Sequence, residues 1–309
     1  MIIALNITKE DFPSVLVILA SYNGERWMSS QLDSLISQNA INCTIWISDD
    51  NSNDLTQSII QNYSKQYTNI KFWSYDNKGK SACANFFRAI ENINISGFNF
   101  ISLADQDDVW VADKLSSAIK MLKETESDAY SSNVTAFWED GKTKLIDKAQ
   151  PQREFDYMFE SAGPGCTFVL TQKIALHLKQ FLNENHKACK EVSMHDWFIY
   201  AFARINGYKW VIDKHSYMQY RQHENNVMGA NAGWQAKLTR WKKLRAGWLT
   251  TQAILLADII GYSDSWVIKR LKRNNLIDKI VLIINVSKFR RKFIDRLALA
   301  ASFLVGIKK

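Results

Sequence analysis

The chain has few of the residues that mark specialised classes of protein. Its 309 residues include only 4 cysteines, 3 prolines and 12 glycines. The cysteines stand far apart and form no Cys-x-x-Cys pair, which excludes a disulfide scaffold or zinc ribbon and fits a reducing compartment. The scarcity of glycine and proline excludes collagen-like and low-complexity structure, and 47% hydrophobic residues are ordinary for a globular protein.

Long apolar runs are also missing. The N-terminus lacks the basic start and the apolar core of roughly 7–15 residues that define a secretory signal. The stretch "VLVILA" at residues 15–20 is too short to span a bilayer and predicts a central strand instead. We therefore expect a cytoplasmic protein.

Charge is divided unevenly along the chain. Residues 1–233 contain 22 Lys and Arg against 27 Asp and Glu, a net charge of −5, whereas residues 234–309 contain 17 Lys and Arg against 4 Asp, a net charge of +13. This division predicts a working domain over 1–233 and a basic tail over 234–309 that meets an anionic surface.

Short apolar, β-branched runs alternate with segments of helical spacing in the first 134 residues. The predicted strands cover residues 14–21, 43–50, 70–76, 98–105 and 128–134, and the predicted helices cover 27–37, 55–67, 81–93 and 112–123. This alternation predicts an α/β fold with a mainly parallel central sheet flanked by helices.

Polar residues follow each of the first four predicted strands. They are Ser21-Tyr22-Asn23, Asp49-Asp50-Asn51, Asp76-Asn77-Lys78-Gly79 and Asp105-Gln106-Asp107-Asp108. Because ligands of open parallel sheets bind outside the carboxyl ends of the strands, this edge is the predicted site.

Three carboxylates, Asp105, Asp107 and Asp108, fall within four positions at the end of a buried strand. Two like charges about 4 Å apart cost on the order of 4 kcal/mol at an effective dielectric of 20, so a cation or a shared proton must offset them. Mg²⁺ bound to a diphosphate would do so, because it commonly takes one or two carboxylates plus phosphate oxygens. The alternative is that these residues cap the helix predicted to begin near Ala112.

Three further sets of residues have an ordinary explanation beside a functional one. Asp49 and Asp50 could accept hydrogen bonds from a base or ribose, or could form an Asx-rich turn into the next helix. Asp196, in "MHDWFIYAFA", could be a general base with a raised pKa or a helix cap. His223, in "YRQHENN", could bind metal or phosphate or could be a surface residue.

Seven segments in chain order resemble the inverting glycosyltransferases of family 2, which have the GT-A fold. They span roughly residues 14–230 and read VLVILASYNGERW, WISDDNSNDLT, DNKGKSACANF, LADQDDVWVADKL, GPGCTFVLT, HDW and YRQHENNVMGA. The fourth, sixth and seventh are similar to those of bacterial rhamnosyltransferases that build O-antigen and other cell-surface polysaccharides. The chain departs from the family at Glu224, where a glycine frequently follows "RQH".

The resemblance implies a role for each matching residue. Those implied to bind the nucleotide-sugar are Ala20, Ser21, Tyr22, Glu25, Asp49, Asp50, Asn77, Gly79, Asn85, Asp105, Gly165, Cys166 and Arg221. Tyr22 would lie against the base, and Asp50 would accept the N3–H that uracil and thymine share. The implied metal ligands are Asp107, Asp108 and His223, and the implied catalytic base is Asp196.

The resemblance also implies an activity. It implies Mg²⁺ or Mn²⁺ as cofactor, dTDP-β-L-rhamnose as donor, and a hydroxyl of a lipid-linked glycan as acceptor. A UDP-hexose donor fits the same residues. A non-catalytic nucleotide-sugar-binding protein is disfavoured, because the chain retains both Asp196 and the DxD pair that the resemblance assigns to Asp105 and Asp107. A metal-dependent phosphatase would place a nucleophilic Asp where Ser21-Tyr22-Asn23 stands.

In the tail, Trp, Leu and Ile recur among Lys and Arg. This pattern predicts amphipathic helices that attach the enzyme peripherally to the anionic inner face of the cell membrane. The alternative is a helical extension that packs on the catalytic domain or pairs two protomers. Nucleic acid is not expected as a partner, because no recognition motif supports it.

Overall fold

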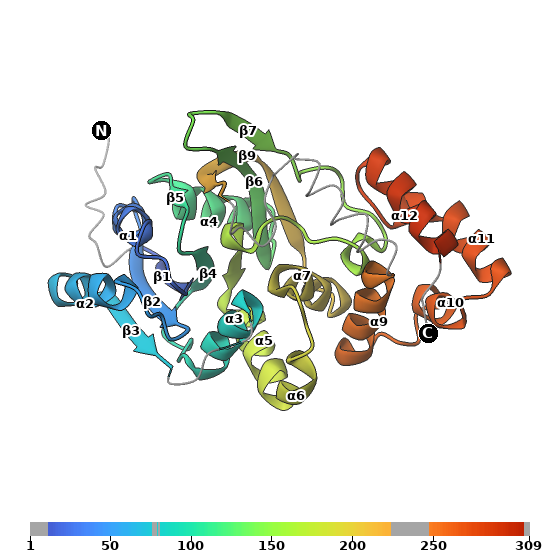
Figure 1. Ribbon diagram of the computed structural model, residues 1–309, viewed down its shortest axis with the longest axis horizontal. Helices are drawn as coiled ribbons and strands as arrows, with labels where there is room; N and C mark the ends of the chain where they lie inside the picture. The colour runs from blue at the N-terminus through green and yellow to red at the C-terminus, as the bar shows by residue number, and fades with distance from the viewer. Residues whose placement is uncertain (1–11, 76–78, 80, 224–246, 306–309) are drawn as a thin grey trace, which may run out of the picture.

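A mixed nine-stranded sheet forms the centre of the protein (Figure 1). The computed structural model describes residues 12–75, 79, 81–223 and 247–305. Within them the strands run in the order β3-β2-β1-β4-β8-β6-β9-β5, with β7 paired to β6. Their bounds are β1 Ser14–Ser21, β2 Asn42–Asp49, β3 Ile70–Ser74, β4 Phe100–Asp105, β5 Val109–Trp110, β6 Ala129–Phe137, β7 Thr143–Ile146, β8 Val169–Thr171 and β9 Trp210–Arg221.

Most of these strands share one direction. β1 to β4 are parallel to one another, and β6 and β9 run the same way. The exceptions are β8, which is antiparallel to both β4 and β6, and the edge strands β5 and β7. The predicted α/β class with a mainly parallel sheet is confirmed.

Helices α1 to α4 connect the strands of the first half. They are α1 Met28–Ile36, α2 Thr56–Gln66, α3 Ala82–Asn92 and α4 Lys114–Glu124, each within two residues of its predicted bounds. β1 is buried on both faces, as a parallel strand covered by helices must be. Its side chains alternate: Val15, Val17 and Leu19 pack in the core that holds α1 and α4, whereas Leu16, Ile18 and Ala20 pack in the core that holds α3.

The second half adds α5 Gln172–Glu184, α6 His186–Cys189 and α7 His195–Ile205, with short 3₁₀ turns at Asp156–Met158 and Gly165–Thr167. α7 is apolar almost all round, and its residues from Trp197 to Ala203 are buried. A helix of this kind needs neighbours on every side. It packs against α3, α5, the 3₁₀ turn at Asp156–Met158 and α9 Trp248–Ile260.

The described C-terminal residues, 247–305, form helices that pack on the rest of the protein (Figure 1). They are α9 Trp248–Ile260, α10 Trp266–Arg273, α11 Leu276–Ile284 and α12 Phe293–Val305. Phe289 and Phe303 from this part share one hydrophobic core with Phe159 and Trp197. The predicted domain boundary at residue 233 falls outside the described residues and stays a prediction.

No helix among the described residues is both long enough and apolar enough to cross a lipid bilayer.

Candidate active site

The acidic end of β4 is a compact cluster. Ligand atoms of Asp105, Asp108 and Cys166 all lie within 4.8 Å of one another. Asp108 is fully buried: its Oδ1 accepts the Arg221 backbone N–H at 3.2 Å, while its Oδ2 has no hydrogen-bond partner. The N-cap of α4 is Asp113. The capping alternative for these three carboxylates is therefore wrong.

Burial and mutual repulsion raise the pKa values of the carboxylates in this cluster. Burial, the charge of Asp107 and that of Asp196 raise the pKa of Asp105 to about 7, and burial with Asp107 and Asp105 raises the pKa of Asp108 well above its usual range. Burial and the charges of Asp108 and Asp105 also raise the pKa of the Cys166 thiol, whose sulfur lies within 4.8 Å of ligand atoms of both carboxylates. The carboxylates of this cluster thus repel one another, and their oxygens are the ligands that a hard divalent cation prefers.

A buried lysine that the sequence reading did not single out lies beside this cluster. The Lys114 side chain is 1% exposed, its Nζ lies 3.3 Å from the centre of the Trp110 ring, and it makes no hydrogen bond. Burial lowers its pKa to about 7, opposed by Cys166 and Asp108. The sequence pattern could have revealed this burial, because Lys114 occupies an apolar position of the helix in "DKLSSAI".

The third carboxylate, Asp107, contacts residues at and just after the end of β9. Its Oδ2 lies 2.7 Å from His223 Nε2, and its backbone carbonyl accepts the Arg221 Nε–H at 2.8 Å. The His223 ring stacks on Trp27 with the ring centres 4.2 Å apart. The structure therefore brings the predicted metal-binding residues of β4 and β9 together, although they are far apart in the sequence.

The adjacent acids after β2 have different surroundings. Asp49 is fully buried and accepts hydrogen bonds from Ser21 Oγ at 2.9 Å and from the N–H and Oγ–H of Ser52 at 2.9 and 2.6 Å. Asp50 accepts the Gly79 N–H at 2.5 Å and pairs with Arg88 Nη2 at 2.5 Å. The turn explanation thus suits Asp49, while Asp50 belongs to a charged pair with Arg88 just after β2.

Gly79 is required next to that pair. A Cβ atom there would lie 2.9 Å from both carboxylate oxygens of Asp50, closer than real Cβ contacts come. The Arg88 guanidinium also lies over the Tyr75 ring, 3.4 Å from its centre. Arg88 was missed in the sequence because nothing local pairs it with Asp50. Asn77 lies outside the described residues.

The end of β1 is fixed by side-chain amides. Gln106 accepts the Tyr22 N–H at 2.8 Å and donates to the Tyr22 carbonyl at 2.9 Å, so it fills the space beside Gly24. Asn85 donates to the carbonyls of Ser21 at 3.3 Å and Ser48 at 2.9 Å. Asn85 therefore ties β1 to β2 at the predicted edge, which is where Ala20 and Ser21 end their strand.

Glu25 lies on the surface and contacts the residue before α2. Its side chain is exposed, and Oε2 accepts the Leu55 N–H at 2.8 Å just before α2 begins. In this structure it contacts the start of a helix, and its predicted role at the nucleotide stays a prediction.

Asp196 stands in the first turn of α7, where its Oδ1 accepts the Trp197 N–H at 2.7 Å. Burial raises the pKa of Asp196 to about 6, although the Trp197 N–H, the charge of Lys148 and the Ser161 hydroxyl lower it. Its charge also raises the pKa of Asp105, so the two carboxylates interact electrostatically. A base that is ionised just below neutral pH suits proton abstraction from a hydroxyl.

His195 supports the same region. Its ring lies 4.2 Å from that of Phe86, and burial lowers the pKa of His195 to about 3, so the imidazole is neutral. A Cβ atom on Gly165 would lie 2.2 Å from His195 Nε2. Gly165 is thus required for close contact between the α7 start and the turn that carries Cys166.

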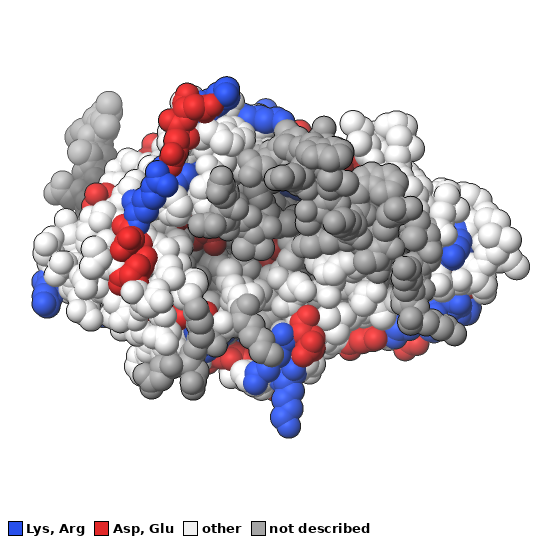
Figure 2. Space-filling view, viewed as in Figure 1, with Lys and Arg blue, Asp and Glu red and all other residues white. Residues whose placement is uncertain are grey.

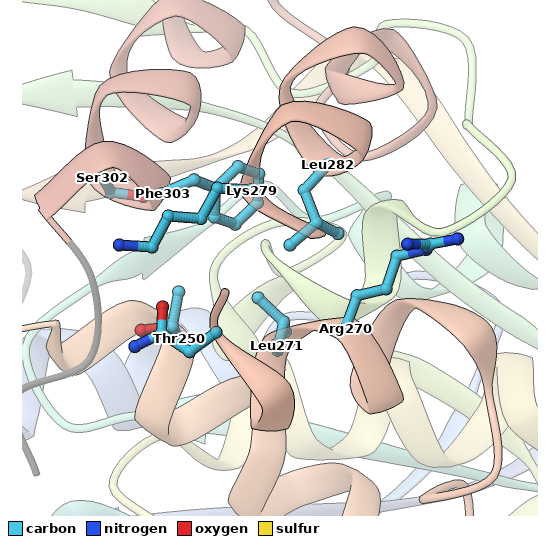
Figure 3. A pocket seen from close by; sticks show the side chains of 8 residues that line it. Thr250, Arg270, Leu271, Lys279, Leu282, Ser302 and Phe303 are labelled. Atoms are coloured by element: carbon cyan, nitrogen blue, oxygen red, sulfur yellow. The ribbon is translucent and has the colours of Figure 1, made fainter. Parts of the chain in front are cut away.

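Two hollows among the described residues lie away from this site. A cavity of about 10 Å³ lies among the C-terminal helices, between side chains such as Thr250, Lys279 and Phe303 (Figure 3). It has room for one water at most. A wider hollow of about 430 Å³, lined by residues including Pro13, Ile41 and Lys120, lies at the amino end of β1. That is the wrong end of the sheet for a ligand of this fold.

Comparisons with known proteins agree with this geometry. Residues 16–181 match the profile of Glycosyl transferase family 2. The dTDP-rhamnosyl transferase RfbG of Shigella flexneri is 38% identical over 290 residues, which cover 94% of this chain and 100% of RfbG. The E. coli protein WfgD, a UDP-Glc:alpha-D-GlcNAc-diphosphoundecaprenol beta-1,3-glucosyltransferase, is 24% identical over 53% of this chain and 62% of WfgD.

Solved structures support the fold. S. aureus TarS 1-349 in complex with UDP-GlcNAc matches with a TM-score of 0.55 at 16% identity, over 88% of this chain and 79% of that one. The mannosyltransferase PcManGT from Pyrobaculum calidifontis, in complex with GDP-Man and Mn²⁺, matches with a TM-score of 0.52 at 14% identity, over 95% of this chain and 85% of that one. The expected GT-A architecture is confirmed, and the chain belongs to glycosyl transferase family 2.

Proposed function

We propose that this glycosyltransferase moves L-rhamnose from dTDP-β-L-rhamnose to a hydroxyl of a glycan acceptor in bacterial surface polysaccharide synthesis. The observation that carries the choice of donor is the 38% identity with RfbG over its full length, because RfbG is named a dTDP-rhamnosyl transferase. The arrangement of Asp50, Asp105 and Asp196 around one edge of the sheet supports the chemistry.

The nucleotide would occupy the carboxyl ends of β1 to β4. Tyr22 lies at the end of β1 for contact with the base, and Asp50 is held by Gly79 and Arg88 with its carboxylate at the same edge. Asp105 would reach the ribose. Gly165 and Cys166 would place backbone atoms beside the donor sugar.

The acidic cluster fits Mg²⁺ or Mn²⁺. The supporting observation is the buried Asp108 Oδ2, which lacks a hydrogen-bond partner within a group of carboxylates whose pKa values are raised. Asp107 and Asp108, with His223 beside them, would hold the ion, which supplies positive charge next to the leaving nucleoside diphosphate when bound. The Cys166 thiol stays protonated and serves as a hydrogen-bond donor.

Asp196 would perform the proton transfer. Its carboxylate takes the proton of the acceptor hydroxyl as that oxygen bonds to the anomeric carbon. The bond from that carbon to the diphosphate oxygen breaks on the opposite face, and dTDP leaves with the bonding electrons. One displacement converts the β-linked donor into an α-L-rhamnoside. General-base assistance of this kind contributes roughly 10²–10⁴-fold to the rate.

A lipid-linked acceptor would explain an unusual surface on α11 and α12. Eight large apolar side chains are exposed there: Leu276, Ile277, Ile280, Ile284, Phe293, Ile294, Leu297 and Leu304. They fall at helical spacing on one face of each helix. Figure 2 shows this end of the molecule as largely uncharged surface with Lys and Arg at its margin. With the +13 charge of the tail, the face suits the anionic inner leaflet, which we propose as its partner.

The donor is tested by thermal unfolding of the full-length protein with dTDP-rhamnose, UDP-glucose, UDP-GlcNAc and GDP-mannose, each with and without Mn²⁺. A ligand at 100 times its Kd stabilises a protein by about 2.7 kcal/mol, which is measurable. We expect a metal-dependent shift with dTDP-rhamnose that exceeds the others. A larger shift with a UDP-hexose would overturn the donor and keep the reaction class.

A further inference from the structure

The segment between α11 and α12 runs along residues 154–161, which lead into the active-site turn. The Phe155 N–H donates to the Lys288 carbonyl at 2.9 Å, and Lys288 Nζ lies 3.0 Å from Glu154 Oε2. The Phe289 ring packs on that of Phe159, with centres 5.1 Å apart. Residues more than 120 positions apart are thus held side by side.

Arg291 makes the most buried of these contacts. Only 3% of the residue is exposed, and its guanidinium lies 3.6 Å from Asp156 Oδ2 and 3.4 Å from Glu160 Oε2. Its backbone N–H donates to Glu160 Oε1 at 2.7 Å, and Nη2 donates to the Ser161 carbonyl at 2.5 Å. A charge this deeply buried is stable only because both carboxylates pair with it.

Two connections lead from Arg291 to the start of α7. Along the chain, Ser161 follows Glu160 directly; its hydroxyl donates to the Gly163 carbonyl at 2.7 Å and lowers the pKa of Asp196. Across the core, Asp156 accepts the Tyr200 hydroxyl at 3.0 Å and lies 3.3 Å from Arg204 Nη1, and both of these residues are on α7. Arg291 therefore restrains the residues on either side of the carboxylate, and touches it at no point.

We propose that Arg291 is a positioning residue for the catalytic base, and that the C-terminal helices are part of the catalytic unit as well as a surface for membrane contact. This inference rests on the proposed function, because that function assigns the base to Asp196. A guanidinium that holds both the 160–161 segment and Asp156 keeps the carboxylate aimed at the acceptor hydroxyl. Small displacements of a reacting group lower the rate steeply.

The surroundings of Asp196 determine what its pH profile reports. The titratable groups that act on it or respond to it are Lys148 after β7, Asp105 at the end of β4, Cys83 on α3 and its neighbour His195. Arg291 acts on this set through Lys148, whose pKa it lowers, so Arg291→Met changes the acid limb through that charge as well as by moving the carboxylate relative to Ser161 and Lys148, whereas Arg291→Lys keeps the charge.

The test compares Arg291→Met and Arg291→Lys with a matched control in the full-length protein. The control is Asp278→Asn, which breaks ion pairs to Arg270 at 2.5 Å and Arg273 at 2.7 Å inside the same C-terminal part, away from residues 154–161. With donor saturating, we expect Arg291→Met to lower kcat by about tenfold or more, leave the donor KM within about twofold and shift the acid limb of the kcat profile. Arg291→Lys should recover part of kcat.

The control separates positioning from stability. Asp278→Asn should lower the unfolding temperature and leave kcat and the acid limb unchanged. Equal loss of kcat in Arg291→Met and Asp278→Asn, or full kcat in Arg291→Met at a temperature where it is folded, would overturn the inference.

A second variant covers the case in which Arg291→Met does not fold. Ser161→Ala keeps every ion pair of Arg291 and removes the hydroxyl that lowers the pKa of Asp196, so we expect the acid limb to move to higher pH. An unmoved limb would count against the connection through Ser161. Asp196→Asn is measured alongside: near-normal transfer by that variant would refute the proposed base itself, whatever Arg291 does.

Discussion

His223 Nε2 lies 2.7 Å from Asp107 Oδ2, and this contact joins the end of β9 to the end of β4 across the acidic cluster. The Trp27 ring stacks on His223 from the β1 side, so three segments meet at one imidazole. A leaving diphosphate at this edge would lie beside the His223 imidazole, whose position depends on all three segments. Replacement of His223 should therefore affect nucleotide binding more than folding.

We expect His223→Gln to weaken binding of dTDP in the presence of Mn²⁺ by about tenfold. A hydrogen bond to a charged group contributes roughly 1.5–3 kcal/mol, and 1.4 kcal/mol corresponds to tenfold in affinity. Titration calorimetry measures it directly. The matched control is His215→Gln, which breaks a similar contact to Asp213 at 2.8 Å outside the site. Equal affinity in the two variants would contradict the assignment of His223.

Asp196→Asn tests the base. The substitution keeps the size and the backbone contact and removes the ability to take a proton, so kcat should fall by about 10²–10⁴-fold. Binding of dTDP should stay within about twofold, because the nucleotide site that we propose lies at the ends of β1 to β4 and Asp196 lies on α7. Radiolabelled sugar transfer measures the first quantity and calorimetry the second. Normal turnover would remove Asp196 from the mechanism.

The pH dependence of kcat follows from the same residue. Burial raises the pKa of Asp196 to about 6, and the ionised form is the active base. With donor saturating, kcat should therefore fall tenfold per pH unit below about pH 6 and level off above it, because kcat reports groups of the substrate complex. A kcat profile that stays flat from pH 5 to pH 8, with circular dichroism showing folded protein throughout, would contradict this.

Gly79→Ala tests whether the position of Asp50 matters for the nucleotide. The new methyl group would meet both Asp50 oxygens at 2.9 Å, which must displace the carboxylate or the glycine backbone. Affinity for dTDP should fall about tenfold, since a misplaced acceptor loses a hydrogen bond to the base. Gly97→Ala is the control, because nothing lies within 4 Å of its added methyl group. Unchanged affinity in both variants would place the base elsewhere.

The sequence alone indicated the parts of this fold that depend on local pattern. β1 ends at Ser21 as predicted, and α1 to α4 begin and end within two residues of their predicted bounds, because strand and helix periodicity is local. The direction of β8 was not predictable, since three buried residues carry no sign of whether their neighbours run parallel or antiparallel.

Some residues of the site could likewise be predicted from local pattern and others could not. Carboxylates at strand ends could be found because parallel strands bring their ends to one edge. The partners that fix them could not: Arg88 reaches Asp50 across 38 positions, and Arg291 reaches Glu160 across 131. Such pairs depend on how helices pack after the sheet has formed. The basic tail illustrates this best, because its alternation of apolar and basic residues fits both packing and membrane contact, and the structure shows apolar side chains on both faces.

Membrane contact is tested by surface substitution, because truncation would expose Phe159 and other core residues that the C-terminal helices cover. Ile277→Glu with Ile294→Glu places two charges on the exposed face of α11 and α12 without altering any buried side chain. Inserting an apolar side chain of this size contributes roughly 1.5–3 kcal/mol, so losing two should reduce partition onto vesicles with anionic lipid by more than about tenfold. Sedimentation with vesicles measures the bound fraction.

The control for that measurement is Leu145→Glu, which changes an exposed apolar residue on β7, away from these helices. It should leave vesicle binding unchanged. Soluble-acceptor turnover should be normal in both variants, because neither changes the sheet edge. If the double variant binds vesicles as well as the unaltered protein does, the apolar face does not contact the bilayer. The eight exposed side chains would then be explained by contact with a second copy of the chain. Light scattering would detect this contact as a dimer that the same two substitutions dissociate.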